Sequence, residues 1–326
     1  MLTTLLLALA LQTATTPAVL DADRREILWN DPKPATLADW IWGPGGEALA
    51  PRPPFRFIKE NLGGTNPKID VVDARGAMWI VKFGGEVRTE TFSARFLSAV
   101  GYVTEPIYFV PSGIIAGAHD LKRARPFVSK GGQFRCARFK LRDESKLAYA
   151  DDFQWSWIAN PFLGSHELNG LKILMMLLSN WDAKDTRDGD GSNTAVFLQP
   201  ASQPPTYLYS FTDWGASLGS WGGFFKRDKW DVSAYERQTR DFIKDVRNGT
   251  IVWGYDGKHG HDIADGITLS DVRWLLPYLS RITDEELRAG FVASGATVAT
   301  AERFTRSLRS RIAQMERITE IPAVTP

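Results

Sequence analysis

The sequence predicts an α+β fold with two lobes, a small β-rich lobe followed by a larger helical lobe. Apolar, β-branched runs separated by turn residues predominate up to about residue 140, as expected for strands. Beyond that point apolar residues recur at helical spacing, or run continuously as they do in a buried helix. We therefore predict a first lobe over residues 21–140 and a second over residues 141–326, with a separate segment at residues 1–20.

The composition excludes several classes of protein. The chain has 326 residues, of which 44% are hydrophobic and 24% charged, which is typical of a globular protein with one large core or two modest ones. A net charge of +1 gives no electrostatic case for binding nucleic acid or acidic lipid. The single cysteine, Cys136, excludes an internal disulfide and a CxxC metal site, and we expect a buried, unreactive thiol.

The N-terminal segment has the features of an export signal. The apolar run at residues 5–11 has the length of a signal-peptide core and is too short to span a membrane. No lysine or arginine precedes it, and residues 16–18 are the best candidate for cleavage. The pattern favours an exported or periplasmic protein; the alternative is a cytoplasmic protein whose N-terminus is frayed or packed. No later stretch qualifies as transmembrane.

The first lobe begins with an irregular segment and a hairpin. Residues 30–54 are rich in proline and tryptophan and predict an irregular leader. The apolar runs at residues 69–73 and 78–83 flank Ala-Arg-Gly-Ala at 74–77, which has the composition of a turn. A β-hairpin is therefore expected here.

One helix and two further strands complete this lobe. The helix is expected over residues 89–100, ending at Gly101, because glycine readily adopts the left-handed conformation of a helix cap. Phe92 and Phe96 lie on its apolar stripe. The strands are expected around residues 107–110 and 134–139, which are apolar and β-branched.

The second lobe is built around a buried helix. Residues 167–179 are almost continuously apolar, as in a central helix, and Ser165 is the candidate N-cap. Short strands are expected at residues 194–198 and 207–211. The C-terminal third is predicted to be helical.

The C-terminal helices carry recognisable start signals and faces. Thr283 and Glu286 have the spacing of a capping box. The last helix has an apolar face and a basic face, and we interpret the basic face as solvated. The apolar face is Phe304, Leu308, Ile312 and Met315, and the basic face is Arg303, Arg306, Arg309 and Arg317.

Two short segments carry the residue types that phosphoryl transfer requires. They read Asn-Trp-Asp-Ala-Lys at residues 180–184 and Thr-Asp-Trp-Gly at residues 212–215. The reaction needs a carboxylate at the acceptor hydroxyl, an amide and a second carboxylate for Mg²⁺, and a lysine on the phosphate. The candidates are Asp182 and Lys184 for catalysis, and Asn193 and Asp213 for the metal.

The first lobe supplies candidates for holding a nucleotide. Lys82 ends a predicted strand, where its ammonium could contact phosphates, and such a lysine needs a carboxylate to orient it. Glu90 on the following helix is the first candidate, and Glu86, one turn earlier, is the weaker one. The segment Gly63-Gly64-Thr-Asn-Pro-Lys68 precedes the hairpin, and glycines let backbone amides approach phosphates. The alternative for this segment alone is a plain turn.

Four stretches resemble HipA-like kinases. They are Gly-Gly-x-x-Pro-Lys at residues 63–68, Trp-Ile-Val-Lys-Phe at 79–83, Glu90 with Gly101 after it, and Asn-x-Asp-x-Lys at 180–184. Asp-Trp-Gly at 213–215 is similar to the Asp-Phe-Gly of protein kinases. The resemblance covers residues 63–215, roughly half of the chain.

The resemblance implies a protein-kinase-like fold that binds ATP and Mg²⁺ between two lobes. Lys82, oriented by Glu90, would bind the phosphates, together with Gly63, Gly64 and Lys68. Lys184 occupies a position where HipA-like enzymes usually have histidine, and is closer to ordinary Ser/Thr kinases. Residues 185–192 lengthen the segment between Asp182 and Asn193.

Other sites can be considered for the same residues. Asp188, Asp190 and Asn193 offer oxygen ligands for Ca²⁺, but an EF-hand register would place threonine or lysine where a carboxylate is required. A simple acidic turn is the preferred interpretation. His259 and His261, with Asp262, could suggest a metal, but their Gly-rich surroundings favour an ordinary loop.

Residues 215–219, Gly-Ala-Ser-Leu-Gly, match the GxSxG nucleophile elbow of α/β-hydrolases, with Ser217 as the nucleophile. That motif requires a helix directly after it, and residues 220–224 are poor helix formers.

We therefore expect an ATP- and Mg²⁺-dependent phosphotransferase acting on an unidentified hydroxyl acceptor, which is a protein or a small molecule. The alternative is a catalytically silent kinase fold that binds nucleotide or serves as a scaffold, and a serine hydrolase is a distant third.

Overall fold

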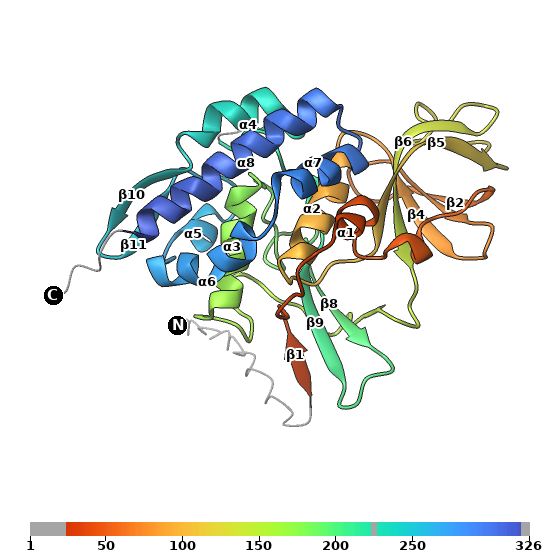
Figure 1. Cartoon of the computed structure of the whole chain (residues 1–326). Helices are drawn as coiled ribbons and strands as arrows, with labels where there is room; N and C mark the ends of the chain where they lie inside the picture. Colours follow the sequence, from red (N-terminus) through yellow and green to blue (C-terminus); the bar gives the residue numbers. More distant parts are fainter. Residues whose placement is uncertain (1–23, 223–226, 321–326) are drawn as a thin grey trace, which may run out of the picture.

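The computed structural model describes residues 24–222 and 227–320 (Figure 1). The apolar run at 5–11, the cleavage candidate at 16–18 and residues 223–224 lie outside the described residues. In chain order the elements are β1 (Arg25–Ile27), α1 (Leu37–Trp42), the 3-10 helix η1 (Glu47–Leu49), β2 (Phe55–Asn61), β3 (Lys68–Val72), β4 (Met78–Lys82), α2 (Val87–Ala99), β5 (Ile107–Ala116), β6 (Gln133–Arg142), β7 (Ala148–Tyr149), α3 (His166–Leu177), β8 (Thr194–Gln199), β9 (Thr206–Phe211), α4 (Val232–Thr239), β10 (Ile243–Arg247), β11 (Thr250–Trp253), α5 (Gly260–Ala264), α6 (Leu269–Ser280), α7 (Asp284–Ala293) and α8 (Val298–Thr319).

The mixed α and β content is confirmed, and the strands of the first part close into a barrel. The barrel order is β2-β3-β4-β6-β5, closed by a parallel pairing of β2 with β5. The predicted hairpin is confirmed as β3 and β4, with Asp70 opposite Ile80. Closure into a barrel was not predicted, because it depends on β2, which gave no clear strand signal, and on a non-local pairing. The boundary at residue 140 stays a prediction; β6 extends to Arg142.

Residues along the barrel strands alternate between its core and a charged face. Ile69, Val71, Trp79, Val81 and Phe139 are buried in one apolar cluster. Side chains on successive strand residues point to opposite faces. The intervening residues of β3, β4 and β6 therefore share the other face, and most of them are charged: Lys68, Asp70, Ile80, Lys82, Arg138, Lys140 and Arg142.

The predicted irregular leader at residues 30–54 contains a helix, which corrects the sequence-based expectation. Thr36 caps α1 through a capping box with Asp39. Trp40 is buried against Phe92 and Phe96 of α2, and Figure 1 shows α1 beside α2. The high proline content of the leader concealed a six-residue helix that is held in place mainly by these tertiary contacts.

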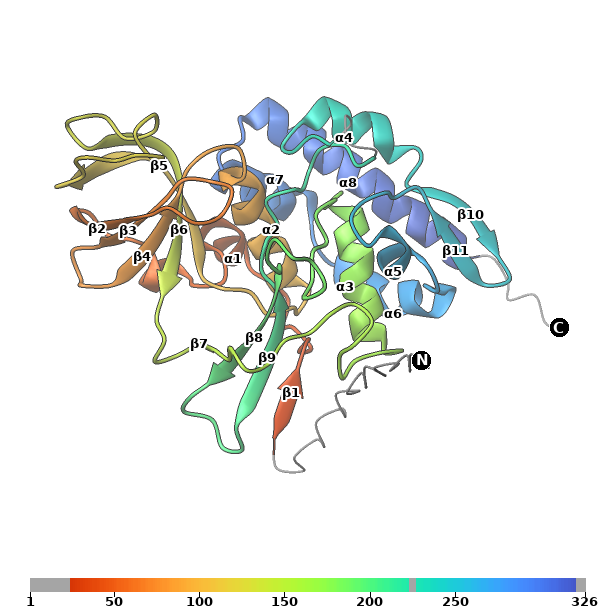
Figure 2. The ribbon, with the colours of Figure 1, turned by 180° about the vertical axis from the view of Figure 1, so that it is seen from behind.

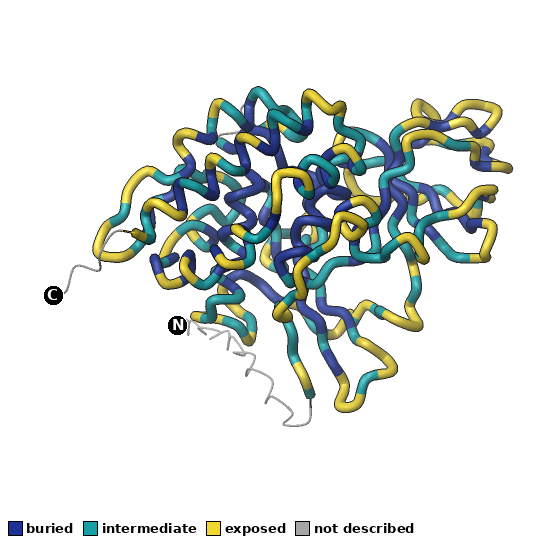
Figure 3. Tube along the Cα trace, viewed as in Figure 1, coloured by how far each residue is buried: buried dark blue, intermediate teal, exposed yellow. Residues whose placement is uncertain are grey.

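The helical part is organised as the sequence predicts, around α3 and α8. Ser165 caps α3, whose apolar residues are buried, and Thr283 and Glu286 form the capping box of α7. The four predicted core residues of α8 are all buried. Figure 3 shows the buried stretches of these helices facing inward, with exposed stretches outside. The hairpin of β10 and β11 interrupts the helices and was not predicted.

The four arginines of the predicted basic face of α8 are exposed or half-buried, whereas a fifth arginine of the helix is buried. Arg303 and Arg309 form ion pairs with Glu236 and Asp284, and Arg306 is largely exposed, as expected for a solvated face. Arg311, which the sequence reading did not single out, is completely buried. Its guanidinium donates to the backbone carbonyl of Leu177 and the hydroxyl of Ser179 at the end of α3.

A second sheet connects the barrel side of the molecule to α3. Its order is β1-β9-β8-β7, and the two predicted strands are confirmed as β8 and β9. Figure 2 shows β8 and β9 between β6 and α3. β9 ends two residues before Asp213, so this sheet positions one of the candidate site residues.

Cys136 is half-buried rather than buried. It has a positive φ of 54° within β6, and its sulfur accepts a hydrogen bond from Arg88 at 3.7 Å. The prediction of a buried thiol was wrong because the irregular backbone at Cys136 interrupts the alternation of inward and outward side chains along β6. Among the described residues, no helix has the length and apolar character needed to cross a membrane.

Candidate functional site

Lys82 lies at the centre of a buried network of charges. Its ammonium is 2.8 Å from Glu86, contacts Glu90 and lies 4.0 Å from Asp213. Burial alone would lower the pKa of Lys82, but the charges of Glu90 and Asp213 outweigh it and raise the pKa. The lysine is therefore permanently charged, and it connects the barrel to the segment that carries Asp213.

The structure gives Lys82 two carboxylate partners where the sequence favoured one. Glu90 also forms an ion pair with Arg138 at 2.6 Å. Glu86, ranked lower from the sequence, accepts from Lys82 and from Lys229 at 2.7 Å. Glu86 reaches Lys82 as well because it is the N-cap residue of α2, so its side chain lies beside that of Glu90 one turn later.

Glu86 also packs against the Asp-Trp-Gly segment. A Cβ atom at Gly215 would lie 2.6 Å from the carboxyl carbon of Glu86. Any side chain at position 215 would therefore collide with Glu86. The amide of Gly215 donates to Asp213 at 2.9 Å and orients its carboxylate.

Glu86 should make the folding stability of the protein depend on pH in the acidic range. Burial favours a higher pKa for this carboxyl, but Lys82 and Lys229 outweigh it and lower the pKa from 4.5 to about 2. A lowered pKa stabilises the fold above the unfolded-state value, and this contribution disappears as the pH falls through the folded-state value. We expect wild-type stability to fall between about pH 5 and pH 2, and Glu86→Gln to lose about 2–3 kcal/mol less over that range.

Thermal unfolding across that range measures the difference, with Glu144→Gln, an exposed glutamate, as the control. Parallel curves for wild type and Glu86→Gln would contradict the assignment.

Asn180 joins the two sequence segments that carry the candidate catalytic groups. Its side-chain oxygen accepts from the amide of Asp182 at 3.0 Å, and its side-chain nitrogen donates to the carbonyl of Asp213 at 3.1 Å. The hydroxyl of Tyr255 donates to its backbone carbonyl at 2.5 Å. Asn180 is itself completely buried. The sequence identified Asn180 only as part of a motif, and its role as the link depends on contacts with distant residues.

Asp182 and Lys184 lie close together, as two neighbouring catalytic groups would. The ammonium of Lys184 is 4.0 Å from the Asp182 carboxylate and 2.9 Å from Asp190. Burial raises the pKa of Asp182, although Lys184 opposes the shift. A carboxylate with a raised pKa is the better proton acceptor at neutral pH.

Asn193 lies beside both segments despite the extra residues before it. Its side-chain nitrogen donates to the backbone carbonyl of Asp182 at 2.8 Å, and its carbonyl accepts from the amide of Thr212 at 2.7 Å. With the nitrogen engaged, the side-chain oxygen is the atom available to a cation. The antiparallel pairing of β8 with β9 explains the placement, because Thr194 lies opposite Phe211.

Acidic residues of the segment 185–192 contact basic side chains. Asp188 lies 2.7 Å from Lys258 and 2.7 Å from His259, and Asp190 is paired with Lys184. These contacts engage carboxylate oxygens of two of the three residues considered for Ca²⁺, Asp188 and Asp190. His261 is exposed, and its contact is with Asp265 on its own helix.

Carboxylates suited to a divalent cation meet next to Lys82. Oxygens of Glu86, Glu90 and Asp213 lie within 4.8 Å of one another. Burial raises the pKa of Asp213, and Lys82 only partly opposes this. Carboxylate and amide oxygens are the ligands that Mg²⁺ prefers, so these residue types suit a magnesium ion, and an ion shared by Asp213 and Asn193 stays a prediction.

The glycine-rich segment forms the connection between β2 and β3. Gly64 has a φ of +73°, and the guanidinium of Arg123 donates to the carbonyl of Gly63 at 3.2 Å. Lys68 has no carboxylate partner within 4 Å among the described residues. Burial lowers its pKa, and the nearby charge of Lys82 lowers it further. A half-buried lysine without a counter-ion, beside a glycine turn, is suited to an anionic ligand.

Ser217 does not have the surroundings of a hydrolase nucleophile. It is completely buried, and its hydroxyl has no hydrogen-bond partner among the described residues. Among the described residues, the first helix after it is α4, which begins at Val232. The nucleophile elbow requires an exposed serine at a strand-to-helix turn.

Comparisons with known proteins give only distant likenesses. The chain matches no known protein family and no curated protein. Among solved structures it is similar to the Helicobacter pylori proinflammatory kinase CtkA, with a TM-score of 0.42, 10% identity, and coverage of 79% of this chain and 94% of the other. It is also similar to the Golgi casein kinase, with a TM-score of 0.39, 11% identity, and coverage of 85% and 76%. A structure of the latter with Mn/ADP bound gives a TM-score of 0.38, 11% identity, and coverage of 85% and 75%. The proposal below rests on the site itself.

Proposed function

We propose that this chain is a protein-kinase-like phosphotransferase, of the HipA-like kind, that transfers the γ-phosphoryl group of ATP to a hydroxyl acceptor. The observation that carries the proposal is the connected set of contacts from Lys82 to Asp213, and through Asn180 to Asp182. These groups come from a barrel strand and from two loops far apart in the sequence. This set connects a lysine for the phosphates, a carboxylate for the metal and a carboxylate for the acceptor hydroxyl, which are groups that phosphoryl transfer requires.

The residues have separate roles. Lys82, held by Glu86 and Glu90, and Lys68 beside Gly63 and Gly64, bind the phosphates of the nucleotide. Mg²⁺ bound by Asn193 and Asp213 would neutralise phosphate charge during transfer. Burial of Lys82 and Glu90 strengthens these interactions because less water screens the buried charges.

Asp182 and Lys184 act on the transferred group. The acceptor oxygen forms a bond to the γ-phosphorus while the bond from that phosphorus to the bridging oxygen of the nucleotide breaks. Asp182 receives the proton of the acceptor hydroxyl, which its raised pKa favours. Lys184 stabilises the negative charge on the phosphoryl oxygens. Lys184 is paired with Asp190, from which the phosphate would withdraw it.

Asp213→Asn tests the metal assignment without requiring an acceptor. We expect ATP to raise the melting temperature of the wild type, and Mg²⁺ to increase that rise. In Asp213→Asn the Mg²⁺-dependent part should disappear, since one carboxylate ligand is lost. Asp241→Asn, an exposed aspartate after α4, is the matched control.

The same experiment separates the proposal from a silent nucleotide-binding scaffold. Stabilisation by Mg²⁺ and ATP, with no ATP consumed over a broad set of acceptors, would favour the scaffold. An unchanged response to Mg²⁺ in Asp213→Asn would remove the metal site.

A further inference from the structure

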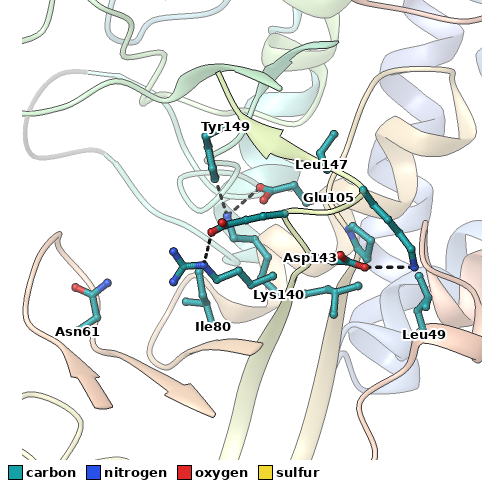
Figure 4. Close-up of a pocket in the computed structure, with 13 residues that line it drawn as sticks. Leu49, Asn61, Ile80, Glu105, Lys140, Asp143, Leu147 and Tyr149 are labelled. Atoms are coloured by element: carbon teal, nitrogen blue, oxygen red, sulfur yellow. Dashed lines mark hydrogen bonds and ion pairs between the residues drawn. The ribbon is translucent and has the colours of Figure 1, made fainter. Parts of the chain in front are cut away.

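Lys140, on the charged face of the barrel, has a carboxylate partner of its own. Its ammonium lies 2.9 Å from Glu105 and 3.2 Å from the hydroxyl of Tyr149, beside a cavity of about 260 Å³. Figure 4 shows these three groups converging. Among the described residues, Glu105 forms an ion pair with no other cation. The charge of Lys140 is therefore balanced locally.

Around Lys82, in contrast, the carboxylates are shared between cations. Glu90 pairs with Lys82 and with Arg138. Glu86 pairs with Lys82 and with Lys229. The third carboxylate of this network, 4.0 Å from Lys82, is the proposed metal ligand. Once that carboxylate binds a metal ion, two glutamates face three cations, and the excess positive charge attracts an anion such as a phosphate.

Lys229 is the most accessible of these three cations. Its side chain is 32% exposed, against 7% for Lys82 and 6% for Arg138. Its ammonium lies 2.7 Å from Glu86, which is its single hydrogen-bond partner among the described residues. Because a lysine ammonium has three N–H groups, Lys229 keeps donors that a ligand can use.

The ammonium of Lys229 lies close to the groups proposed to bind phosphates. One oxygen of Glu86, Oε1, accepts from Lys229 at 2.7 Å, and the other, Oε2, accepts from Lys82 at 2.8 Å. Oε2 also accepts from the side-chain nitrogen of Asn66, which belongs to the glycine-rich segment. A Cβ atom at Gly85 would lie 3.7 Å from the Cε atom of Lys229, so this side chain packs over the connection from β4 to α2. Lys229, Lys82 and the glycine-rich segment therefore meet at one carboxylate.

The backbone of residues 215–219, which match the GxSxG pattern, holds Lys229 in this place. The amide of Trp230 donates to the carbonyl of Ser217 at 3.1 Å. A Cβ atom at Gly219 would lie 2.3 Å from the carbonyl oxygen of Asp228. Glycine at this position therefore lets the backbone directly before Lys229 approach.

The first glycine of the same pentapeptide admits the other partner of the ion pair. Any side chain at Gly215 would collide with Glu86. The amide of Leu218 donates to the carbonyl of Leu178 at 2.7 Å, which joins the pentapeptide to the end of α3. The motif that matches a nucleophile elbow thus serves to bring Glu86 and Lys229 together.

We propose that Lys229 is a further phosphate-binding residue, which contacts the terminal phosphates of the bound nucleotide. The inference rests on the proposed phosphotransferase function. Lys82 belongs to the barrel, whereas Lys229 comes from the helical part, which also carries Asp182 and Lys184. The terminal phosphate is the one that reaches those groups during transfer. Because Glu86 already orients both ammonium groups, little side-chain freedom is lost when the phosphates bind.

Equilibrium binding of AMP, ADP and AMP-PNP, a non-hydrolysable analogue of ATP, to the full chain with Mg²⁺ tests the inference. In Lys229→Met we expect ADP and AMP-PNP to bind about tenfold more weakly, as the loss of one hydrogen bond to a charged group implies. The affinity for AMP should change much less, because its single phosphate contacts Lys82. Lys229→Arg should restore most of the affinity. Lys244→Met, which removes an exposed lysine of β10, is the control and should behave as the wild type.

The dependence on the number of phosphates separates a phosphate contact from a structural role. An ion pair that only held the segment in place would, when lost, weaken the binding of all three nucleotides alike. Equal losses for AMP and ADP, or no loss in Lys229→Met, would overturn the role of Lys229 and leave the phosphotransferase proposal standing. Failure of the wild type to bind any of the three nucleotides would overturn both.

Discussion

Replacing Asp182 with asparagine is expected to lower the rate of phosphate transfer about a thousandfold while Mg²⁺–nucleotide affinity changes little. A positioned general base contributes roughly 10²–10⁴ in rate, and asparagine keeps the shape of the side chain but accepts no proton. The backbone of residue 182 keeps its hydrogen bonds with Asn180 and Asn193, so the loop stays in place. Single-turnover transfer and equilibrium nucleotide binding, measured on the same preparation, separate the two quantities.

The pH dependence gives a second readout for Asp182. Burial raises its pKa, so the wild-type rate should decline in acid at a higher pH than an ordinary aspartate would cause. In Asp182→Asn the residual rate should lack this decline. Asp245→Asn, an exposed aspartate of β10, is the control and should follow the wild type. Transfer at the wild-type rate in Asp182→Asn would exclude a catalytic role for this residue.

Replacing Arg311 with methionine is expected to destabilise the protein by about 3–5 kcal/mol, the range measured when one member of a buried polar network is removed. The guanidinium donates to the carbonyl of Leu177 at 3.0 Å and to the hydroxyls of Ser179 and Thr239 at 2.7 and 3.1 Å. It also lies 3.7 Å from the ring centre of Tyr235. Burial lowers the pKa of Arg311 to about 10, so it is charged at neutral pH. Methionine leaves the acceptors buried without donors.

Chemical denaturation measures the loss of stability, and Arg306→Met is the matched control. Arg306 lies on the same helix, is largely exposed and has only a 3.8 Å ion pair with Glu302, so its loss should cost less than about 1 kcal/mol. Equal effects of the two substitutions would show that the buried hydrogen bonds of Arg311 add nothing to stability. Because Ser179 directly precedes the loop that carries Asp182, we also expect slower phosphate transfer in Arg311→Met.

The predictable parts of the fold were those coded by neighbouring residues. The cap at Ser165, the capping box at Thr283 and the hairpin of β3 and β4 each depend on residues a few positions apart, and all were found. Barrel closure through β2 and β5 depends on pairing Phe55 with Ile115, which no local pattern indicates.

In the candidate site too, residues within short motifs could be predicted, and residues that meet only through distant contacts could not. Asp182, Lys184 and Asp213 lie in recognisable short motifs, and the structure places them in one connected network. Glu105 and Lys140 belong to no motif: Lys140 lies one residue beyond the strand predicted at 134–139, and Glu105 lies in the connection before β5. Their pairing becomes visible only once β5 and β6 are placed side by side, with Ile107 opposite Lys140.

The alternation along β4 has a consequence for the changes in length that this protein can tolerate. Deleting one residue of β4 before Lys82 would move Lys82 to the barrel interior and put Phe83 in its place at the phosphate site, because each shift by one residue exchanges the two faces of a strand. Residues 185–192 show the opposite case, since the additional residues leave Asn193 beside Asp182. Insertions and deletions should therefore accumulate in such loops, while each barrel strand keeps a fixed number of residues even where the residues themselves change.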